Sequence, residues 1–146
     1  MATPALATIG YEFDTQGAVI DKLKAAGVEV LIDVRAVASS RKAGFSKSLL
    51  AASLAEAGID YLHLRGLGTP KAGRQAARAG RTQEMHDIFN AHMAEPQAQA
   101  ELGQAVEVAA RKKAALLCYE ADVGHCHRAI VAELICEALG CKIQNL

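Results

Sequence analysis

The chain has 146 residues, a formal net charge of zero and 51% hydrophobic residues, which suits one ordinary globular domain spanning residues 1–146. Its longest apolar run, residues 114–119, is far shorter than the roughly 20 residues of a membrane span. The first residues have neither the basic start nor the apolar stretch of a secretory signal. The balanced charge excludes a globally basic nucleic-acid binder and an acidic disordered chain. We therefore expect a soluble, cytoplasmic protein without a membrane partner.

Strand and helix patterns alternate along the first part of the chain. A short strand at residues 8–11 precedes a helix that Asp14 caps and Gly27 ends. Residues 28–34 are β-branched and almost continuously apolar, which predicts the strongest strand. The next elements are a helix between Ser46 and Gly58 and a strand at residues 59–62.

Residues 64–81 interrupt this alternation. They are rich in glycine and arginine and contain no sizeable apolar residue after Leu67, so little burial offsets the entropy of ordering them. The sequence predicts an irregular, mobile loop with one short helical turn at most. Residues 61–83 contain no acid and carry five basic residues: Arg65, Lys71, Arg74, Arg78 and Arg81.

The second half of the chain is predicted to add three helices and two strands. They are a helix from Thr82 that Pro96 breaks, a helix through Ala109, a buried strand at 114–119, a helix from Cys126 to Leu139, and a strand at 141–146. This alternation implies a small, single-domain Rossmann-like fold, doubly wound around a mostly parallel sheet. The common strand order 3-2-1-4-5 would make the first and fourth strands neighbours, with Tyr11 facing the Cys126 loop.

The loops that follow the strands carry the polar residues expected of a site. In a doubly wound sheet these loops emerge at one edge, where ligands bind. The candidates are Tyr11 after the first strand, Asp33, Arg35 and Arg41 after the second, His63 after the third, and Glu120, His125, Cys126, His127 and Arg128 after the fourth. The opposite edge carries only residues that end helices.

Cys126, His127 and Arg128 fall at a predicted helix start, where free backbone N–H groups favour an anion. A thiol there should ionise more easily than the ordinary cysteine pKa of about 8.5 allows. We interpret Cys126, His127 and His125 as catalytic, and the remaining candidates as binding residues. The alternatives are that Cys126 only packs, that His127 is solvated, and that Arg128 pairs with an acid.

Other residues leave two interpretations open. Asp33 and Arg35 are an internal ion pair or a substrate-recognition pair, and Arg41 is an anion clamp or a solvated surface charge. The four cysteines are expected to be free thiols in a reducing cytosol. Cys118 is expected to pack inertly, with partnership with Cys126 as the alternative.

The sequence indicates no metal and no cofactor. A structural zinc module is disfavoured because the chain has no C-x2-C pair. A metal site built from Cys118 and residues 125–127 is disfavoured because adjacent side chains point in different directions.

Several short motifs, in order along nearly the whole chain, resemble one known family. They are Thr-Ile-Gly-Tyr (8–11), Asp-Val-Arg (33–35), Ser-Arg followed by Phe (40, 41, 45), Gly-Ile-Asp-Tyr-Leu-His-Leu (58–64), Leu-Gly (67–68) and Leu-Cys-Tyr-Glu…Cys-His-Arg (117–128). The chain resembles the bacterial and archaeal "domain of unknown function 488" family. This resemblance implies a Rossmann-like α/β fold and supplies no reaction.

Two functions from different classes follow. The first is a thiol-dependent transferase or hydrolase-like enzyme, acting on a small anionic or phosphorylated, nucleotide-derived substrate at the Cys-His-Arg site. The second is a non-catalytic module that binds nucleic acid or another anion through basic residues 61–83. Nucleic acid is the less favoured partner, because no aromatic residue beyond Tyr61 interleaves these cations.

Overall fold

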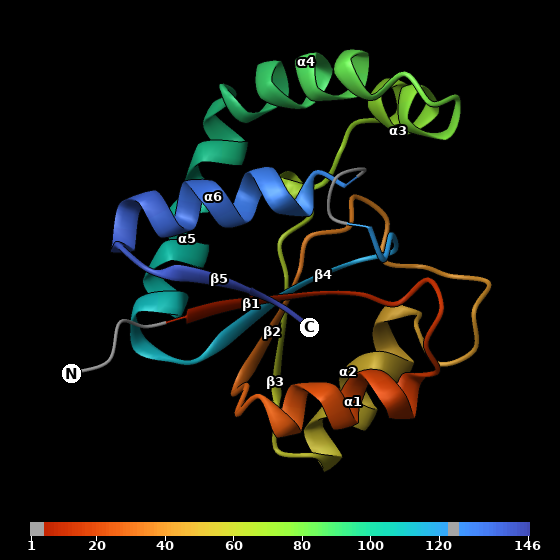
Figure 1. The fold of residues 1–146 in the computed structure, drawn as a ribbon, viewed down its shortest axis with the longest axis vertical. Coiled ribbons are helices and arrows are strands. Elements are labelled where there is room, and N and C mark those ends of the chain that lie inside the picture. Colours follow the sequence, from red (N-terminus) through yellow and green to blue (C-terminus); the bar gives the residue numbers. More distant parts are fainter. Residues whose placement is uncertain (1–4, 123–125) are drawn as a thin grey trace.

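A computed structural model describes residues 5–122 and 126–146. Its centre is a five-stranded sheet in which every strand pair is parallel (Figure 1). The strands are β1 (Ala5–Gly10), β2 (Val30–Asp33), β3 (Asp60–His63), β4 (Ala114–Cys118) and β5 (Lys142–Asn145). The predicted Rossmann-like, doubly wound α/β fold is confirmed.

Helices cover both faces of the sheet (Figure 1). The first two helices, α1 (Gln16–Ala25) and α2 (Lys47–Glu56), pack on one face. The opposite face is covered by α5 (Pro96–Arg111) and α6 (Arg128–Leu139), and α4 (Thr82–Met93) adds side chains to the same buried cluster. None of the helices in the described part of the chain has the length and apolar content that a membrane span requires.

The two faces bury alternate residues of the same strands. Ala7 and Leu31 pack beneath α1 and α2, whereas their neighbours Leu6 and Ile32 belong to the cluster under α5 and α6. Successive side chains of a strand point to opposite faces, so a strand covered on both faces needs an unbroken apolar run. This requirement explains why the second and fourth predicted strands were the clearest in the sequence.

The strand order is β3-β2-β4-β1-β5, so the expected order 3-2-1-4-5 is wrong. All five residues of β4 are buried, and this strand lies between β2 and β1, where both of its edges are paired. The first and fourth strands are nevertheless neighbours, as expected, and Gly10 lies opposite Cys118. The chain leaves β1 and β2 toward one face and β4 toward the other, which opens a crevice at the carboxyl end of β4.

The prediction of an irregular segment at residues 64–81 is wrong, because it contains a 3-10 turn (Arg65–Leu67) and helix α3 (Lys71–Arg78). Small residues make this helix possible. Gly73 and Ala76 are buried, and a Cβ on Gly73 would crowd methyl groups of Thr69 and Ile88. The helix is therefore held by close approach to α4 and not by large apolar side chains. Its predicted mobility stays a prediction.

Two helix starts differ from the sequence expectation. Thr15, not Asp14, caps α1, and its hydroxyl accepts a hydrogen bond from the Ala18 N–H at 3.1 Å. Helix α6 begins at Arg128, so Cys126 lies just before its first turn. Gly140 ends α6 in the left-handed conformation, with φ of 67°, as its position in the sequence predicts.

Candidate functional site

A cavity of about 530 Å³ opens at the carboxyl ends of β1, β2 and β4. Its size falls within the range of small-molecule sites. Loop residues after the three strands form most of its wall, and α3 closes the remaining side. The lining residues are Tyr11, Arg35, Ala36, Val37, Ser39, Ser40, Arg41, Thr69, Arg74, Ala77, Arg78, Met85, Cys118, Tyr119, Glu120, Cys126 and His127.

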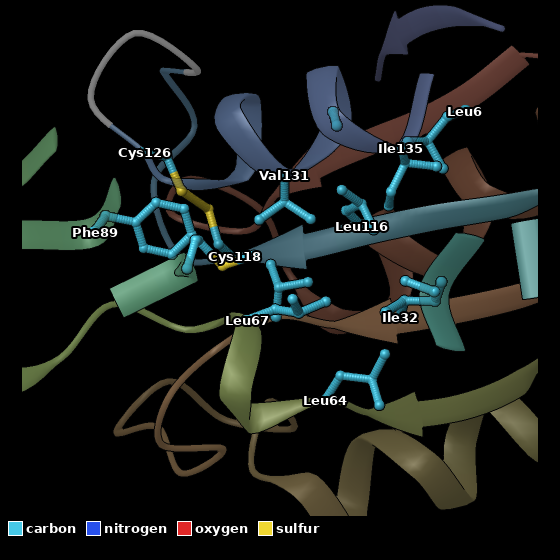
Figure 2. Close-up of a cluster of buried hydrophobic side chains, with 14 of the residues drawn as sticks. Leu6, Ile32, Leu64, Leu67, Phe89, Leu116, Cys118, Cys126, Val131 and Ile135 are labelled. Carbon is cyan, nitrogen blue, oxygen red and sulfur yellow. A yellow bond between two sulfur atoms is a disulfide. The ribbon is translucent and has the colours of Figure 1, made fainter. Parts of the chain in front are cut away.

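Cys118 and Cys126 form a disulfide (Figure 2), and both residues line this cavity. Cys118 ends β4, and Cys126 immediately precedes α6, so the return of the chain from strand to helix brings the two sulfurs together. Cys136 and Cys141 form a second disulfide. The expectation of four free thiols is therefore wrong, and Cys118 is the partner of Cys126 and not merely a packing residue.

Arg128 contacts both sulfurs of the first disulfide. Its backbone N–H lies 3.4 Å from Cys126 Sγ, and its guanidinium Nη1 lies 3.0 Å from Cys118 Sγ. The same nitrogen donates to the carbonyl of Glu120 at 2.7 Å. Although Arg128 is only 2% exposed, its Nε has no hydrogen-bond partner among the described residues. Burial lowers the pKa of Arg128 below its ordinary value.

His127 presents a free lone pair to Cys126. Its Nε2 lies 2.7 Å from the carbonyl oxygen of Val34, which can only accept, so Nε2 carries the hydrogen. In the neutral ring Nδ1 is then an acceptor, and it lies 3.7 Å from Cys126 Sγ. Burial lowers the pKa of His127 to about 4, and the charge of Arg128 acts in the same direction. At neutral pH the ring is therefore an uncharged proton acceptor beside the sulfur.

Glu120 has the corresponding position beside Cys118. Its Oε2 lies 3.6 Å from Cys118 Sγ. Burial raises the pKa of the Glu120 carboxyl, and the charge of Glu12 raises it further.

The loop that carries Glu120 is held close to β1. A Cβ on Gly10 would overlap the carbonyl oxygen of Glu120 and approach the Arg128 guanidinium. The backbone N–H of Tyr11 donates to the carbonyl of Cys118 at 3.3 Å. Glycine at position 10 therefore allows β1 to approach the end of β4, which fixes the loop above the cysteines.

Asp33 and Arg35 form an internal ion pair, which is one of the two interpretations that the sequence left open, and a role of Arg35 in substrate recognition stays a prediction. Arg35 Nη2 lies 2.6 Å from Asp33 Oδ2, with exposed fractions of 6% and 0%. The remaining guanidinium hydrogens bind the Tyr11 hydroxyl and the carbonyl of Phe45. Burial lowers the pKa of Arg35, but its hydrogen bonds and charge pairing with Asp33 outweigh this and raise it above the ordinary value.

Tyr61 and His63 of β3 complete this framework. The Tyr61 hydroxyl donates to Asp33 at 2.5 Å, and burial together with that bond raises the Tyr61 pKa. His63 Nε2 donates to the carbonyl of Arg35 at 2.8 Å. Asp33 and His63 thus hold Arg35 in the loop after β2 by hydrogen bonds, and neither residue lines the cavity.

Three other arginines give the cavity its positive charge. Within the described ranges, the side chains of Arg41 and Arg78 make no hydrogen bond or ion pair, and both residues are exposed. Arg74 uses Nη1 to bind the carbonyl of Thr69 at 2.8 Å and keeps its other donors. Glu120 is the only acid among the lining residues of the described chain. The cavity therefore has an excess of positive charge, which favours an anionic ligand.

Three potential metal ligands meet here, namely Cys118, Glu120 and Cys126, whose donor atoms lie within 4.8 Å of one another. The disulfide occupies both sulfurs. In the reduced protein the guanidinium of Arg128, 3.0 Å from Cys118 Sγ, would oppose a cation at this place. The arrangement fits a dithiol better than a metal centre.

The structure brings together most of the residues that the sequence suggested. Cys126, His127, Tyr11, Arg35, Arg41 and Glu120 line the cavity, and Arg128 lies directly behind the cysteines. His125 lies outside the described residues. Sequence reasoning missed Arg74 and Arg78 as cavity residues, although their spacing of four places them on one face of a helix.

Comparison with known proteins gives one match. The family model described as "Domain of unknown function DUF488" matches residues 15–135. No curated protein and no solved structure matches the chain. The matched region contains β2, β3 and β4, the cavity-lining α3 and both cysteines of the cavity. The chain belongs to the domain of unknown function 488 family.

Proposed function

We propose that this protein is a thiol-dependent enzyme whose substrate is a small anion bound in the cavity. One observation carries the proposal: Cys126 lies in the wall of a cavity whose uncommitted charges are arginines. Arg41, Arg74 and Arg78 come from two different segments and reach the same space. Together they suit a phosphate or carboxylate group, which accepts several charged hydrogen bonds at once.

Cys126 is the proposed nucleophile once the disulfide is reduced. Its thiolate, formed by loss of the proton to solvent, would be stabilised by the Arg128 N–H at the start of α6, and the neutral ring of His127 would lie 3.7 Å from the sulfur. Arg41 and Arg78 would hold the anionic part of the substrate. Tyr11 and Arg35 would keep the wall rigid, since their polar groups already bind one another.

The nucleic-acid module finds less support. Of the five cations in residues 61–83, Arg74 and Arg78 face the cavity, and Arg81 pairs with Glu84 at 2.5 Å. The segment thus does not present one continuous basic surface. A small anion fits this distribution better than a polyanion does.

Two alkylating reagents of similar shape and different charge test the proposal. Iodoacetate is an anion and iodoacetamide is neutral, so their ratio of rates at Cys126 in the reduced protein reports recruitment of anions. We expect the ratio in wild type to exceed that of a free peptide thiol, and the Arg41→Ala/Arg78→Ala variant to lower it by about tenfold.

The matched control is Arg111→Ala, which removes an exposed arginine on α5 that pairs with Glu107. It should leave the ratio unchanged. Competition by inorganic pyrophosphate should slow alkylation by iodoacetate in wild type and not in the double variant. Equal ratios in wild type and the double variant would contradict the anion site.

A further inference from the structure

The two cavity cysteines share surroundings that a purely structural crosslink does not require. Each sulfur has its own proton acceptor, His127 Nδ1 for Cys126 and Glu120 Oε2 for Cys118. A single residue, Arg128, donates to both sulfurs. The Arg128 donors stabilise a thiolate at either sulfur, and a permanent disulfide needs none of these polar contacts.

The pair also borders the cavity, where Cys118 is 1% exposed and Cys126 is 2% exposed. Both cysteines line the cavity, together with the arginines that favour an anion. Both sulfurs are therefore placed to react with the same bound substrate.

We infer that Cys118 is a second catalytic cysteine, and that Cys118 and Cys126 together reduce an anionic, low-molecular-weight disulfide bound in the cavity. This inference rests on the proposed function and adds to it the reaction and the class of substrate. The reaction is thiol–disulfide exchange, in which the reduced protein supplies two electrons.

The steps balance without another cofactor. The Cys126 thiolate attacks one sulfur of the substrate, the substrate S–S bond breaks, and the first thiolate leaves and takes a proton from solvent. The Cys118 thiolate then attacks the Cys126 sulfur of the mixed disulfide. The second substrate thiolate leaves with the Cys118 proton carried by Glu120, and the Cys118–Cys126 disulfide remains. An external dithiol reductant returns the pair to the thiol form.

The cavity favours a disulfide over an oxyanion as the substrate. Removing oxygen from an oxyanion releases water and needs a strong acid beside the leaving oxygen. His127 is neutral at pH 7, and Glu120 faces Cys118 as its acceptor. A leaving thiolate needs no such acid, because it is a stable anion that the nearby arginines also favour.

The test mixes reduced protein with glutathione disulfide, which is an anion, or with cystamine, which is a cationic disulfide. Peptide mapping by mass spectrometry identifies the state of each cysteine. In wild type we expect a Cys118–Cys126 disulfide without a lasting adduct, formed at least about tenfold faster with glutathione disulfide than with cystamine. In a Cys136→Ser/Cys141→Ser background, two glutathione thiols should be released per protein.

Single-cysteine variants assign the roles. Cys118→Ser should stop after release of one thiol, with glutathione retained on Cys126, and Cys118→Ala gives the same readout if the serine variant does not fold. Cys126→Ser should react at least about tenfold more slowly. Rapid adduct formation at Cys118 in Cys126→Ser, or release of two thiols by Cys118→Ser, would overturn the inference.

The two proposals can fail separately. Loss of the iodoacetate preference would remove the anion site and, with it, the basis of this inference. A retained preference combined with an adduct that Cys118 never resolves would leave the anion site standing and reject only the second catalytic cysteine.

Discussion

The two disulfides of this protein lie toward opposite ends of α6 and have contrasting surroundings. Cys126 precedes the helix and bonds to Cys118, among a histidine, a carboxyl and an arginine. Cys136 lies near the end of the helix and bonds to Cys141, which follows Gly140. Cys118, Cys126 and Cys136 all belong to the same buried cluster, but among the described residues no side-chain hydrogen bond reaches either sulfur of the second pair.

Chain entropy does not separate the two crosslinks. Their sequence separations are eight and five residues, so each should constrain the unfolded chain by a similar amount, about 2 to 3 kcal/mol. What differs is the chemistry around the sulfur atoms. A cysteine pair is therefore assigned a role from its polar neighbours and its access to a cavity, and not from its contribution to stability.

The largest expected effect is a loss of stability in acid that depends on His127. The folded protein keeps His127 unprotonated until the pH approaches 4, whereas the unfolded chain takes up the proton near pH 6.5. The stabilisation is therefore complete above pH 6.5 and is lost as the pH falls from 6.5 to 4. We expect a loss of about 3 kcal/mol in the free energy of unfolding, measured by urea denaturation across this range.

The control is His127→Gln, whose amide N–H can still reach the carbonyl of Val34 but does not titrate. In this variant the free energy of unfolding should no longer depend on protonation of residue 127, but it should still depend on other titrating groups such as Glu120. If the free energy of unfolding falls equally with pH in the two proteins, the ring beside Cys126 is not a neutral acceptor. The contrast between the two cysteine pairs would then weaken.

Removing the second disulfide should affect stability alone. We expect Cys136→Ser/Cys141→Ser to lower the free energy of unfolding by about 2 kcal/mol, because the unfolded chain gains the freedom that the crosslink removed. Urea denaturation of the oxidised proteins measures this loss. The iodoacetate preference at Cys126 should not change, and a change would mean that the two ends of α6 are coupled.

A smaller effect is expected from Gly10→Ala, which tests how tightly the end of β4 is held. The added Cβ would overlap the carbonyl of Glu120, so the loop must shift, at a cost of at least about 1 kcal/mol. Thermal denaturation measures the cost. Gly17→Ala is the matched control, since no atom lies within 4 Å of its added Cβ on α1, and it should stabilise slightly. Equal stabilities would show that the loop above the cysteines is not tightly fixed.

The sequence contained the fold and most of the cavity because both depend on local patterns. Apolar runs mark the strands buried on two faces, and Gly27, Gly58 and Gly140 mark three helix ends. Polar residues directly after strands must meet at one edge of a parallel sheet, so Tyr11 and Cys126 could be grouped without coordinates.

Helix α3 and the pairing of Asp33 with Arg35 could not be settled in this way. The helix depends on how closely Gly73 approaches Thr69 and Ile88, and that distance is a property of packing between segments. The ion pair depends on burial, which leaves Arg35 6% exposed and commits its donors to the protein.

The sequence by itself determined the alternation of strands and helices and the edge of the sheet where chemistry is concentrated, because side-chain periodicity and turn residues are local. Only the tertiary structure decided that β4 lies between β2 and β1 and that Cys118 meets Cys126. Strand order and sulfur pairing depend on contacts between distant segments, whose free energies no local pattern records.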